Sequence, residues 1–199
     1  SRKAAARASA KASITGAGSA GWLEAMPDHY DALETRDPAQ REREQAARLP
    51  EIVARAMSAH QRGDLDAAER DYRAALAAVP AHPYALHYLG MIAFQRGRTD
   101  AALPPLAAAV RAVPREPEFH NNLGIVLAAL DRPAEAAAAH RRALDLAPAN
   151  AGAWNNLGLA LQLANDLDGA IDAFGRALAL QTGFAQARWN LSLALLAAG

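Results

Sequence analysis

The chain has 199 residues, 52% of them hydrophobic and 21% charged, which is enough to bury one core as a single domain or a short repeat array. Its 21 Lys and Arg balance its 21 Asp and Glu, so no overall charge favours nucleic acid or an anionic membrane as partner. The absence of cysteine excludes disulfides and thiolate sites and fits a reducing compartment. We therefore expect a cytoplasmic protein. No apolar run approaches the ~18 residues of a membrane span, so we expect no transmembrane helix.

Residues 1–21 contain four basic residues and no acidic one. The stretch from Gly16 to Gly21 fits the G-x-G-x-x-G spacing of dinucleotide-binding loops, but no hydrophobic strand precedes it and helical patterns follow it. A basic flexible tail or linker is therefore the better interpretation of residues 1–21.

Residues 22–48 are predicted to be a helical capping segment. Apolar residues are dense from Trp22 to Met26, and Pro27 suits the first turn of a helix. We expect this segment to pack on the first repeat as a cap or to fold into a groove, its own or a neighbour's. A further helix is predicted to begin at Pro38 and to run to about Leu49, where Pro50 breaks or restarts it.

From residue 49 onward the sequence repeats itself every 34 residues. Equivalent residues recur in several columns: Leu89, Leu123, Leu157 and Leu191; Gly90, Gly124 and Gly158; Ala68, Ala102, Ala136 and Ala170; Pro80, Pro114 and Pro148. A fixed period of this size indicates a solenoid, in which each unit buries its apolar face against its neighbours. Four units, 49–82, 83–116, 117–150 and 151–184, are followed by 185–199, the first helix of a fifth, incomplete unit.

Each unit is predicted to hold two helices, A and B, because its apolar residues are three and four apart. Breaks fall between the two helices at Gly63, Gly97, Asp131 and Asn165. Residues are numbered by position within their 34-residue unit. Glycine at position eight and alanine at position 20 let the helices approach closely, where a larger side chain costs ~1–3 kcal/mol. Bulkier residues share position 24: Tyr72, Leu106, His140 and Phe174.

The pattern Trp154, Leu157 and Gly158, followed by spaced alanines and a proline, resembles the tetratricopeptide repeat family. The first unit departs most from it, with Ile52, Arg55 and Ala56 at the equivalent positions. The resemblance implies an all-α fold: a right-handed superhelical solenoid of about four and a half helix-turn-helix repeats, whose A helices line a concave face.

Helical geometry places positions four, seven, eight and eleven of helix A in a buried seam and directs positions two, six, nine and thirteen into the groove. Position six then carries a row of asparagines: Asn122, Asn156 and Asn190. A second asparagine precedes the first two of them, Asn121 before Asn122 and Asn155 before Asn156. Amides both donate and accept hydrogen bonds, so the row can clasp the backbone of an extended peptide. The alternative is that these amides only solvate the groove.

Position nine is apolar in all five units, with Met57, Met91, Ile125, Leu159 and Leu193, and Phe94 lies one turn further along the second unit. An exposed apolar row indicates a binding surface, to which Tyr88 at position six can add stacking. The alternative is that neighbouring A helices cover these residues as ordinary core.

Family resemblance also excludes one kind of site. Repeats that grip a C-terminal carboxylate carry Lys and Asn where this chain has Val53 and Met57. The asparagine row is instead similar to the grooves of repeat domains attached to protein O-linked glycosyltransferases. The tail from Phe184 to Gly199 is also similar to the repeat that precedes the glycosyltransferase domain of many bacterial proteins.

No catalytic residue, metal site or cofactor is predicted. The six histidines show no spacing that puts two of them on one helix face beside a carboxylate. The acidic residues lie at turns and helix starts, where they cap helices.

The predicted function is a protein-protein interaction scaffold that binds a peptide or protein segment in its concave groove. The alternative is the substrate-recognition domain of a larger protein glycosyltransferase whose catalytic domain is absent. A third possibility is self-association through the N-terminal segment or the incomplete C-terminal repeat. The sequence does not identify the partner.

Overall fold

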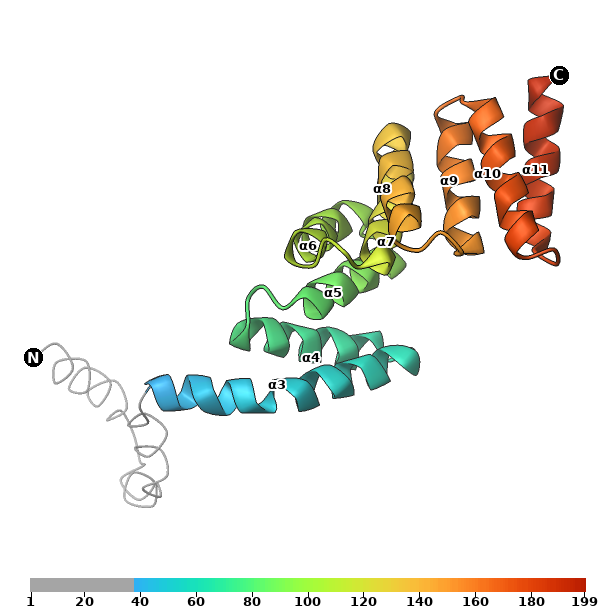
Figure 1. The fold of residues 1–199 in the computed structure, drawn as a ribbon. Helices are drawn as coiled ribbons and strands as arrows, with labels where there is room; N and C mark the ends of the chain where they lie inside the picture. Colours follow the sequence, from blue (N-terminus) through green and yellow to red (C-terminus); the bar gives the residue numbers. More distant parts are fainter. Residues whose placement is uncertain (1–37) are drawn as a thin grey trace, which may run out of the picture. The chain divides into compact units, whose positions relative to one another are not determined.

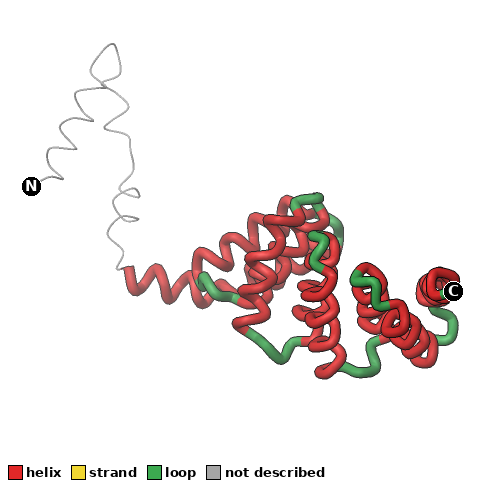
Figure 2. The backbone as a smooth tube through the Cα atoms, turned by 90° about the horizontal axis from the view of Figure 1, so that it is seen from above, coloured by secondary structure: helices red, strands yellow, loops and turns green. Residues whose placement is uncertain are grey.

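The structure, a computed structural model, describes the backbone of residues 38–199 and the side chains from residue 47 onward. The chain divides into two compact units, residues 1–45 and 46–199, and the account below concerns the second. Predictions for the tail 1–21, its glycine motif and the capping segment up to residue 37 lie outside the described residues, as does the side-chain packing of residues 38–46. All elements within the described residues are helices (Figure 2).

Nine helices follow one another along the described part of the chain (Figure 1). Their bounds are α3 Pro38–Gln61, α4 Leu65–Ala78, α5 Pro83–Gln95, α6 Thr99–Ala112, α7 Pro117–Ala129, α8 Pro133–Leu146, α9 Ala151–Leu163, α10 Leu167–Leu180 and α11 Ala185–Ala198. From α4 onward each helix packs against the next, and the A helices α5, α7, α9 and α11 also contact their neighbours in the row. The predicted all-α solenoid of helix pairs is confirmed. None of the described helices is long and apolar enough to span a membrane.

Helix α3 differs from the prediction at Pro50. We expected this proline to end or restart the helix, yet α3 continues from Pro38 to Gln61 with Pro50 inside it. A proline removes one backbone N–H and therefore one hydrogen bond to the preceding turn. Packing of the following residues Ile52, Ala56 and Ala59 into the first core cluster favours the helical path beyond it.

The turn between helices A and B is built in the same way in every unit. Position 15 has a left-handed backbone, with φ of 78° at Gly63, 72° at Gly97, 56° at Asp131 and 61° at Asn165. The N–H after this residue bonds back to a carbonyl of helix A, as from Asp166 to Leu161 at 2.8 Å. Gly, Asn and Asp are the residues that adopt this conformation most readily, so the predicted breaks are confirmed.

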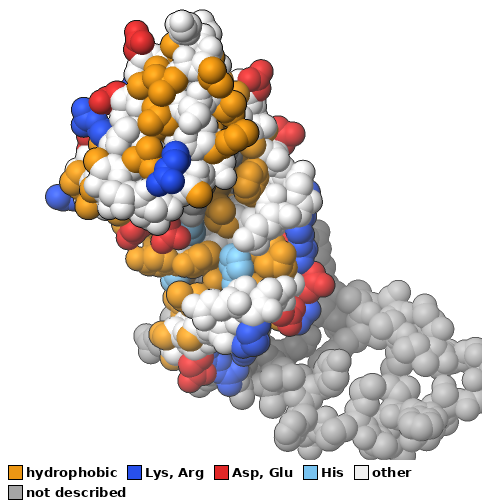
Figure 3. All heavy atoms as spheres, turned by 90° about the vertical axis from the view of Figure 1, so that its right-hand side faces the viewer, with side chains coloured by type: hydrophobic (Ala, Val, Ile, Leu, Met, Phe, Trp, Pro, Cys, Tyr) orange, Lys and Arg blue, Asp and Glu red, His pale blue; other side chains and the backbone are white. Residues whose placement is uncertain are grey.

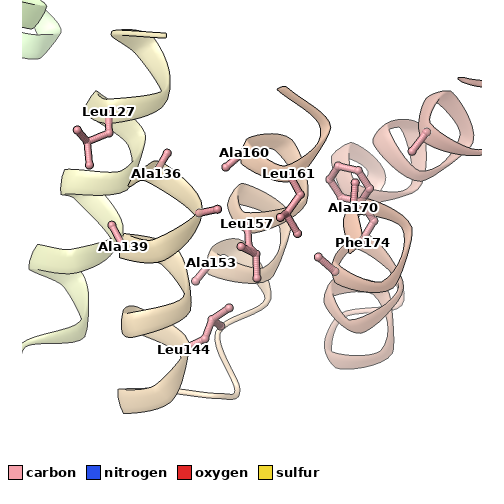
Figure 4. Packing of buried hydrophobic residues seen from close by; sticks show 13 residues of the cluster. Leu127, Ala136, Ala139, Leu144, Ala153, Leu157, Ala160, Leu161, Ala170 and Phe174 are labelled. Atoms are coloured by element: carbon pink, nitrogen blue, oxygen red, sulfur yellow. The ribbon is translucent and has the colours of Figure 1, made fainter. Parts of the chain in front are cut away.

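Close packing of helix A on its own helix B explains the glycine at position eight. A Cβ added to Gly158 lies 2.5 Å from the Phe174 ring, and one added to Gly124 lies 2.6 Å from the His140 ring. Buried alanines and leucines of α7, α8 and α9 lie between the helices, together with Ala170 and Phe174 of α10 (Figure 4). Positions eight and 24 therefore face each other, a pairing that the sequence analysis did not predict.

The buried seam of helix A is wider than predicted. Position three is fully buried in units two to five, at Ala85, Phe119, Ala153 and Ala187, and so is position ten, at Ile92, Val126, Ala160 and Ala194. These residues contact the preceding unit. Position four was predicted to be buried, but its residue in the fourth unit, Trp154, is only half-buried. A solenoid helix packs on two sides, so one stripe does not account for its core.

Candidate functional site

The exposed side of the A helices carries the predicted binding residues, and we call it the A-helix face: positions two, six, nine and thirteen of α3, α5, α7, α9 and α11. Position nine is at least partly exposed along the whole row. Met57 and Leu159 are each 37% exposed and Leu193 is 41% exposed, while Met91 and Ile125 are half-buried. An apolar row thus reaches the surface in all five units.

The asparagines of the NNLG motifs bond between repeats. Asn156 Nδ2 donates to Asn121 Oδ1 at 3.3 Å, and Asn190 Nδ2 donates to Asn155 Oδ1 at 2.9 Å. In the second unit His87 takes the place of the first asparagine, and its Nε2 lies 3.2 Å from Asn122 Nδ2. Each position-six amide therefore ties its A helix to position five of the preceding unit, so the row is not a set of free amides.

Two asparagines of the row nevertheless keep a carbonyl oxygen that makes no hydrogen bond within the described residues. Asn122 and Asn156 are half-buried, and their Oδ1 atoms have no hydrogen-bond partner among the described residues. Asn190 is only 5% exposed, and its Oδ1 accepts from Gln186 Nε2 at 3.3 Å. The structure thus brings two carbonyl acceptors to the A-helix face and buries the third residue.

Asn121 connects the row to the core of its own unit. Its Oδ1 accepts from the Nδ1 of His140, 3.0 Å away, in addition to Asn156. This bond gives the buried imidazole at position 24 a polar partner. Burial lowers the pKa of His140 to about 4, so that the ring is neutral near pH 7.

His87 is held among aromatic rings. It stacks on Phe119 with ring centroids 4.4 Å apart and meets Tyr88 edge-on at 5.1 Å. Burial, and secondarily the nearby His60, lower the pKa of His87 to about 4. This residue was not predicted as part of the site; its occurrence at position five, where later units have asparagine, was the available signal.

Tyr88, Met91 and Phe94 lie closer to the core than predicted. Tyr88 stacks on Tyr72 with centroids 5.3 Å apart, and burial raises the pKa of its hydroxyl. Met91 and Phe94 are partly buried against the cluster that contains Leu106. Each of the three side chains therefore packs partly in the core and is only partly exposed on the A-helix face.

A second regular bond escaped the sequence analysis. Position four donates to the carbonyl at position 32 of the preceding unit: His120 Nε2 to Pro114 O at 2.9 Å, Trp154 Nε1 to Pro148 O at 2.9 Å, and an Arg188 nitrogen to Thr182 O at 2.8 Å. Three different side chains make the same contact, so a comparison of residue types could not reveal it. These bonds fix the loop between successive units.

Two cavities accompany these features. The larger, about 340 Å³, lies between α8, α9 and α10 and is lined by Trp154, with Arg176 stacked 4.8 Å above the Trp154 ring centroid. The smaller, about 150 Å³, lies between α3, α4 and α5 and includes Met57 of the A-helix face. Among the described residues, no three His, Asp or Glu side chains meet as a metal site.

Known structures share this architecture. A MamA protein is 27% identical, with a TM-score of 0.67 over 73% of this chain and 80% of that one. YrrB, described as a TPR protein with an unusual peptide-binding site, is 23% identical, with a TM-score of 0.66 over 73% of this chain and 75% of that one. The first TPR of Spaghetti (RPAP3), bound to the HSP90 peptide SRMEEVD, is 23% identical, with a TM-score of 0.56 over 58% of this chain and 91% of that one.

A match between the chain and a protein-family model identifies the sequence family. No curated protein sequence matches the chain significantly. The tetratricopeptide repeat family model matches residues 53–117, 96–151 and 121–183, which together span most of the solenoid. With the 34-residue units, the stacked helix pairs and the glycine contacts already described, the chain belongs to the tetratricopeptide repeat family.

Proposed function

We propose that this chain is a protein-interaction scaffold that binds a peptide or protein segment along the A-helix face. The observation that carries the proposal is the apolar row at position nine, which reaches the surface in every unit. Apolar side chains that reach the surface at the same position of successive units are typical of a binding surface. YrrB and the Spaghetti repeat, whose descriptions name a peptide site and a bound peptide, have the same fold and support this function.

The open amides supply the polar part of the proposed contact. Asn122 Oδ1 and Asn156 Oδ1 can each accept a backbone N–H of an extended segment, while their Nδ2 atoms hold the side chains in place. Because the preceding unit fixes the amide orientation, less conformational entropy is lost on binding. Backbone contacts of this kind select an extended shape rather than a particular sequence.

The test is a selection of ligands from a random peptide library on the intact chain. We expect Leu159→Glu to weaken the selected peptides by about tenfold or more, because it places a charge in an apolar contact. The control is Ala138→Glu, on the exposed surface of helix α8. Equal affinity of both variants and the unmodified chain rejects the A-helix face as the binding surface.

A second pair of variants tests the amides. Asn156→Ala removes the free acceptor and is expected to weaken a selected peptide by about 0.5–1.5 kcal/mol. Asn121→Ala removes the same bond between repeats, and also the partner of the buried His140 Nδ1, but leaves Asn156 Oδ1 in place. If Asn121→Ala weakens binding as much as Asn156→Ala, the amide affects the repeat packing and not the ligand.

The glycosyltransferase alternative uses the same surface. A substrate-recognition domain also needs backbone contacts that tolerate many sequences, and the open Oδ1 atoms of Asn122 and Asn156 favour such a role. The reading frame of the parent gene distinguishes the two functions. Continuation into an α/β nucleotide-sugar domain supports the alternative, and its absence removes it.

Self-association is favoured by helix α11. Hydrophobic side chains gather over the C-terminal helices (Figure 3), and Trp189 and Leu196 are 63% and 79% exposed. A second copy that covers this surface removes it from water. Light scattering over a dilution series of the chain and of Leu196→Glu tests this candidate; a mass that stays monomeric at every concentration rejects it.

A further inference from the structure

The A-helix face is almost free of charge. Positions two, six, nine and thirteen of the five units hold one charged side chain, Glu118 at position two of the third unit. The other units have Pro50, Tyr84, Gly152 and Gln186 at this position. Because removal of charges from water opposes binding, the face suits a ligand that is uncharged along most of its length. A single carboxylate on such a surface gives it one point of charge selectivity.

The Glu118 carboxylate is exposed and is not neutralised by a neighbouring side chain. It is 60% exposed, and its Oε1 lies 3.7 Å from His87 Nε2. Burial lowers the pKa of His87 to about 4, so this ring is neutral near pH 7. Among the residues whose side chains the structure describes, no arginine pairs with Glu118. By contrast, Glu69 and Glu135 both pair with arginines.

Glu118 and Asn122 lie on the same side of helix α7. Residues four apart are neighbours on a helix surface, and both side chains approach His87 Nε2, at 3.7 Å and 3.2 Å. Ile125, three residues further on, is the position-nine residue of the same unit. One stripe of α7 thus presents a carboxylate, an amide oxygen and an aliphatic side chain over about 10 Å.

An exposed aromatic ring lies near this stripe. Tyr84 occupies position two of the preceding unit, is 43% exposed, and contacts the Phe119 ring at a centroid distance of 5.4 Å. Burial is the main cause of the raised pKa of Tyr88, and Glu118 and Tyr84 raise it further because both lie near its hydroxyl. The face of a tyrosine ring attracts lysine and arginine side chains. A carboxylate and an aromatic ring together favour a basic side chain.

We propose that the segment bound along the A-helix face carries a lysine or arginine whose side chain pairs with Glu118 and lies against Tyr84. The backbone of the segment donates to Asn122 Oδ1, and one helical turn, about 5.4 Å, separates this contact from the carboxylate. A lysine or arginine side chain is long enough to span that distance. The inference rests on the proposed function, since it assigns the charge of one ligand residue on the same surface.

Stabilisation of a helix start is the competing explanation for Glu118. A carboxylate in the first turn of a helix, as in α7, interacts favourably with the helix dipole. The A helices α5, α9 and α11 have no acidic residue in their first turn, so the repeat does not require one. Glu135 lies in the first turn of the B helix α8, outside the A-helix face, and is therefore the matched control.

The test compares selection from one random peptide library on the intact chain and on two charge variants. On the unmodified chain we expect peptides with a lysine or arginine to be enriched about threefold over peptides with an acidic residue, as for an exposed ion pair. Glu118→Lys should reverse this preference, and Glu135→Lys should leave it unchanged. No preference on the unmodified chain, or the same preference on Glu118→Lys, overturns the proposal.

The affinity of one selected peptide provides a second measurement. Replacement of its basic residue by glutamine should weaken binding about threefold on the unmodified chain and should have no effect on Glu118→Gln. Circular dichroism shows whether each variant is folded; if Glu118→Lys is not, the milder Glu118→Gln decides the question by this comparison. An equal loss on both chains overturns the proposal, because the basic residue then does not contact Glu118.

Leu159→Glu separates this inference from the proposed function. Selected peptides that respond to Leu159→Glu, but whose charge preference does not change in Glu118→Lys, reject the basic contact alone. A basic preference that reverses in Glu118→Lys, in peptides insensitive to Leu159→Glu, supports the contact with Glu118 while the proposed binding along the apolar row fails.

Discussion

Asn190 donates a hydrogen bond to Asn155 over 2.9 Å, although the two residues are 35 positions apart in the sequence. Both side chains are only 5% exposed. The bond joins the first helix of the fifth, incomplete unit to the first helix of the fourth. It is the most buried member of a series that links successive repeats along the A helices.

Removal of this bond should destabilise the C-terminal end of the solenoid. Asn190→Ala leaves the buried Asn155 Oδ1 without its donor, which costs about 1–3 kcal/mol. Urea unfolding followed by circular dichroism measures the loss. Ser192→Ala, at an exposed position of the same helix, is the control. Equal midpoints for the two variants contradict a structural role for the amide bond.

The glycine at position eight should not tolerate a methyl group. In Gly158→Ala the new Cβ lies 2.5 Å from the Phe174 ring, and because the ring is fully buried we expect a loss of about 1–3 kcal/mol. Gly175→Ala in helix α10 has nothing within 4 Å and should stabilise the helix by about 0.5–1 kcal/mol. Thermal melts of both variants test the contrast; the same sign of change in both refutes it.

Stability should fall as the solution is acidified. The folded-state pKa of His140 is about 4, below the ordinary value of 6.5, so between these values the unfolded chain binds more protons than the folded one. The contribution is fully present above the ordinary pKa, declines as pH falls toward 4, and amounts to about 2 kcal/mol between pH 6.5 and 5. His87, with a pKa also lowered to about 4, adds a similar dependence.

His140→Phe isolates the share of one histidine, because Phe174 shows that the position accepts this ring. We expect the variant to lose less free energy of unfolding than the unmodified chain when urea titrations at about pH 7 and about pH 5 are compared. The carboxylates are common to both proteins and cancel in the difference. Identical pH dependence means that His140 is not held neutral by burial.

The left-handed turn residue should be replaceable by asparagine but not by alanine. Gly97 has φ of 72°, and no atom lies within 4 Å of the place that a Cβ would take, so the cost of Gly97→Ala is that of the backbone alone, about 1–2 kcal/mol. Gly97→Asn should be nearly neutral, because Asn165 adopts φ of 61° at the equivalent position. Melting temperatures that do not distinguish the two variants contradict this account.

The parts of the fold that could be predicted are those that recur at one position of the repeat. Gly158 and Phe174 belong to columns of small and bulky residues, and Asn165 belongs to a column of turn residues, so alignment of the units revealed them. The bonds between repeats join position six of one unit to position five of the preceding unit. Alignment of the units compares residues at the same position, so it does not reveal contacts between different positions. In addition, position five is His87 in the second unit and Asn121 in the third, so the acceptor does not form a column of one residue type.

The unpredicted parts depend on what a residue contacts across a unit boundary. Pro50 has the local preference of a helix terminator, but the contacts of Ile52 and Ala56 with the next helices outweigh it. Likewise Glu118 resembles an ordinary acidic residue at a helix start, and only its place beside His87 and Asn122 distinguishes it.

The offset of the amide bonds limits how the chain can change in length. Duplication of a complete 34-residue unit creates one more donor and one more acceptor in register, so such a gene duplication lengthens the A-helix face, the proposed binding surface, without a mismatch at the junction. Insertion or loss of a single residue before position six of an A helix rotates that position by about 100° about the helix axis. The amide at position six then no longer faces its acceptor in the preceding unit. Evolution of this protein by whole units is therefore far easier than by small insertions, and ligand length is expected to vary in the same steps.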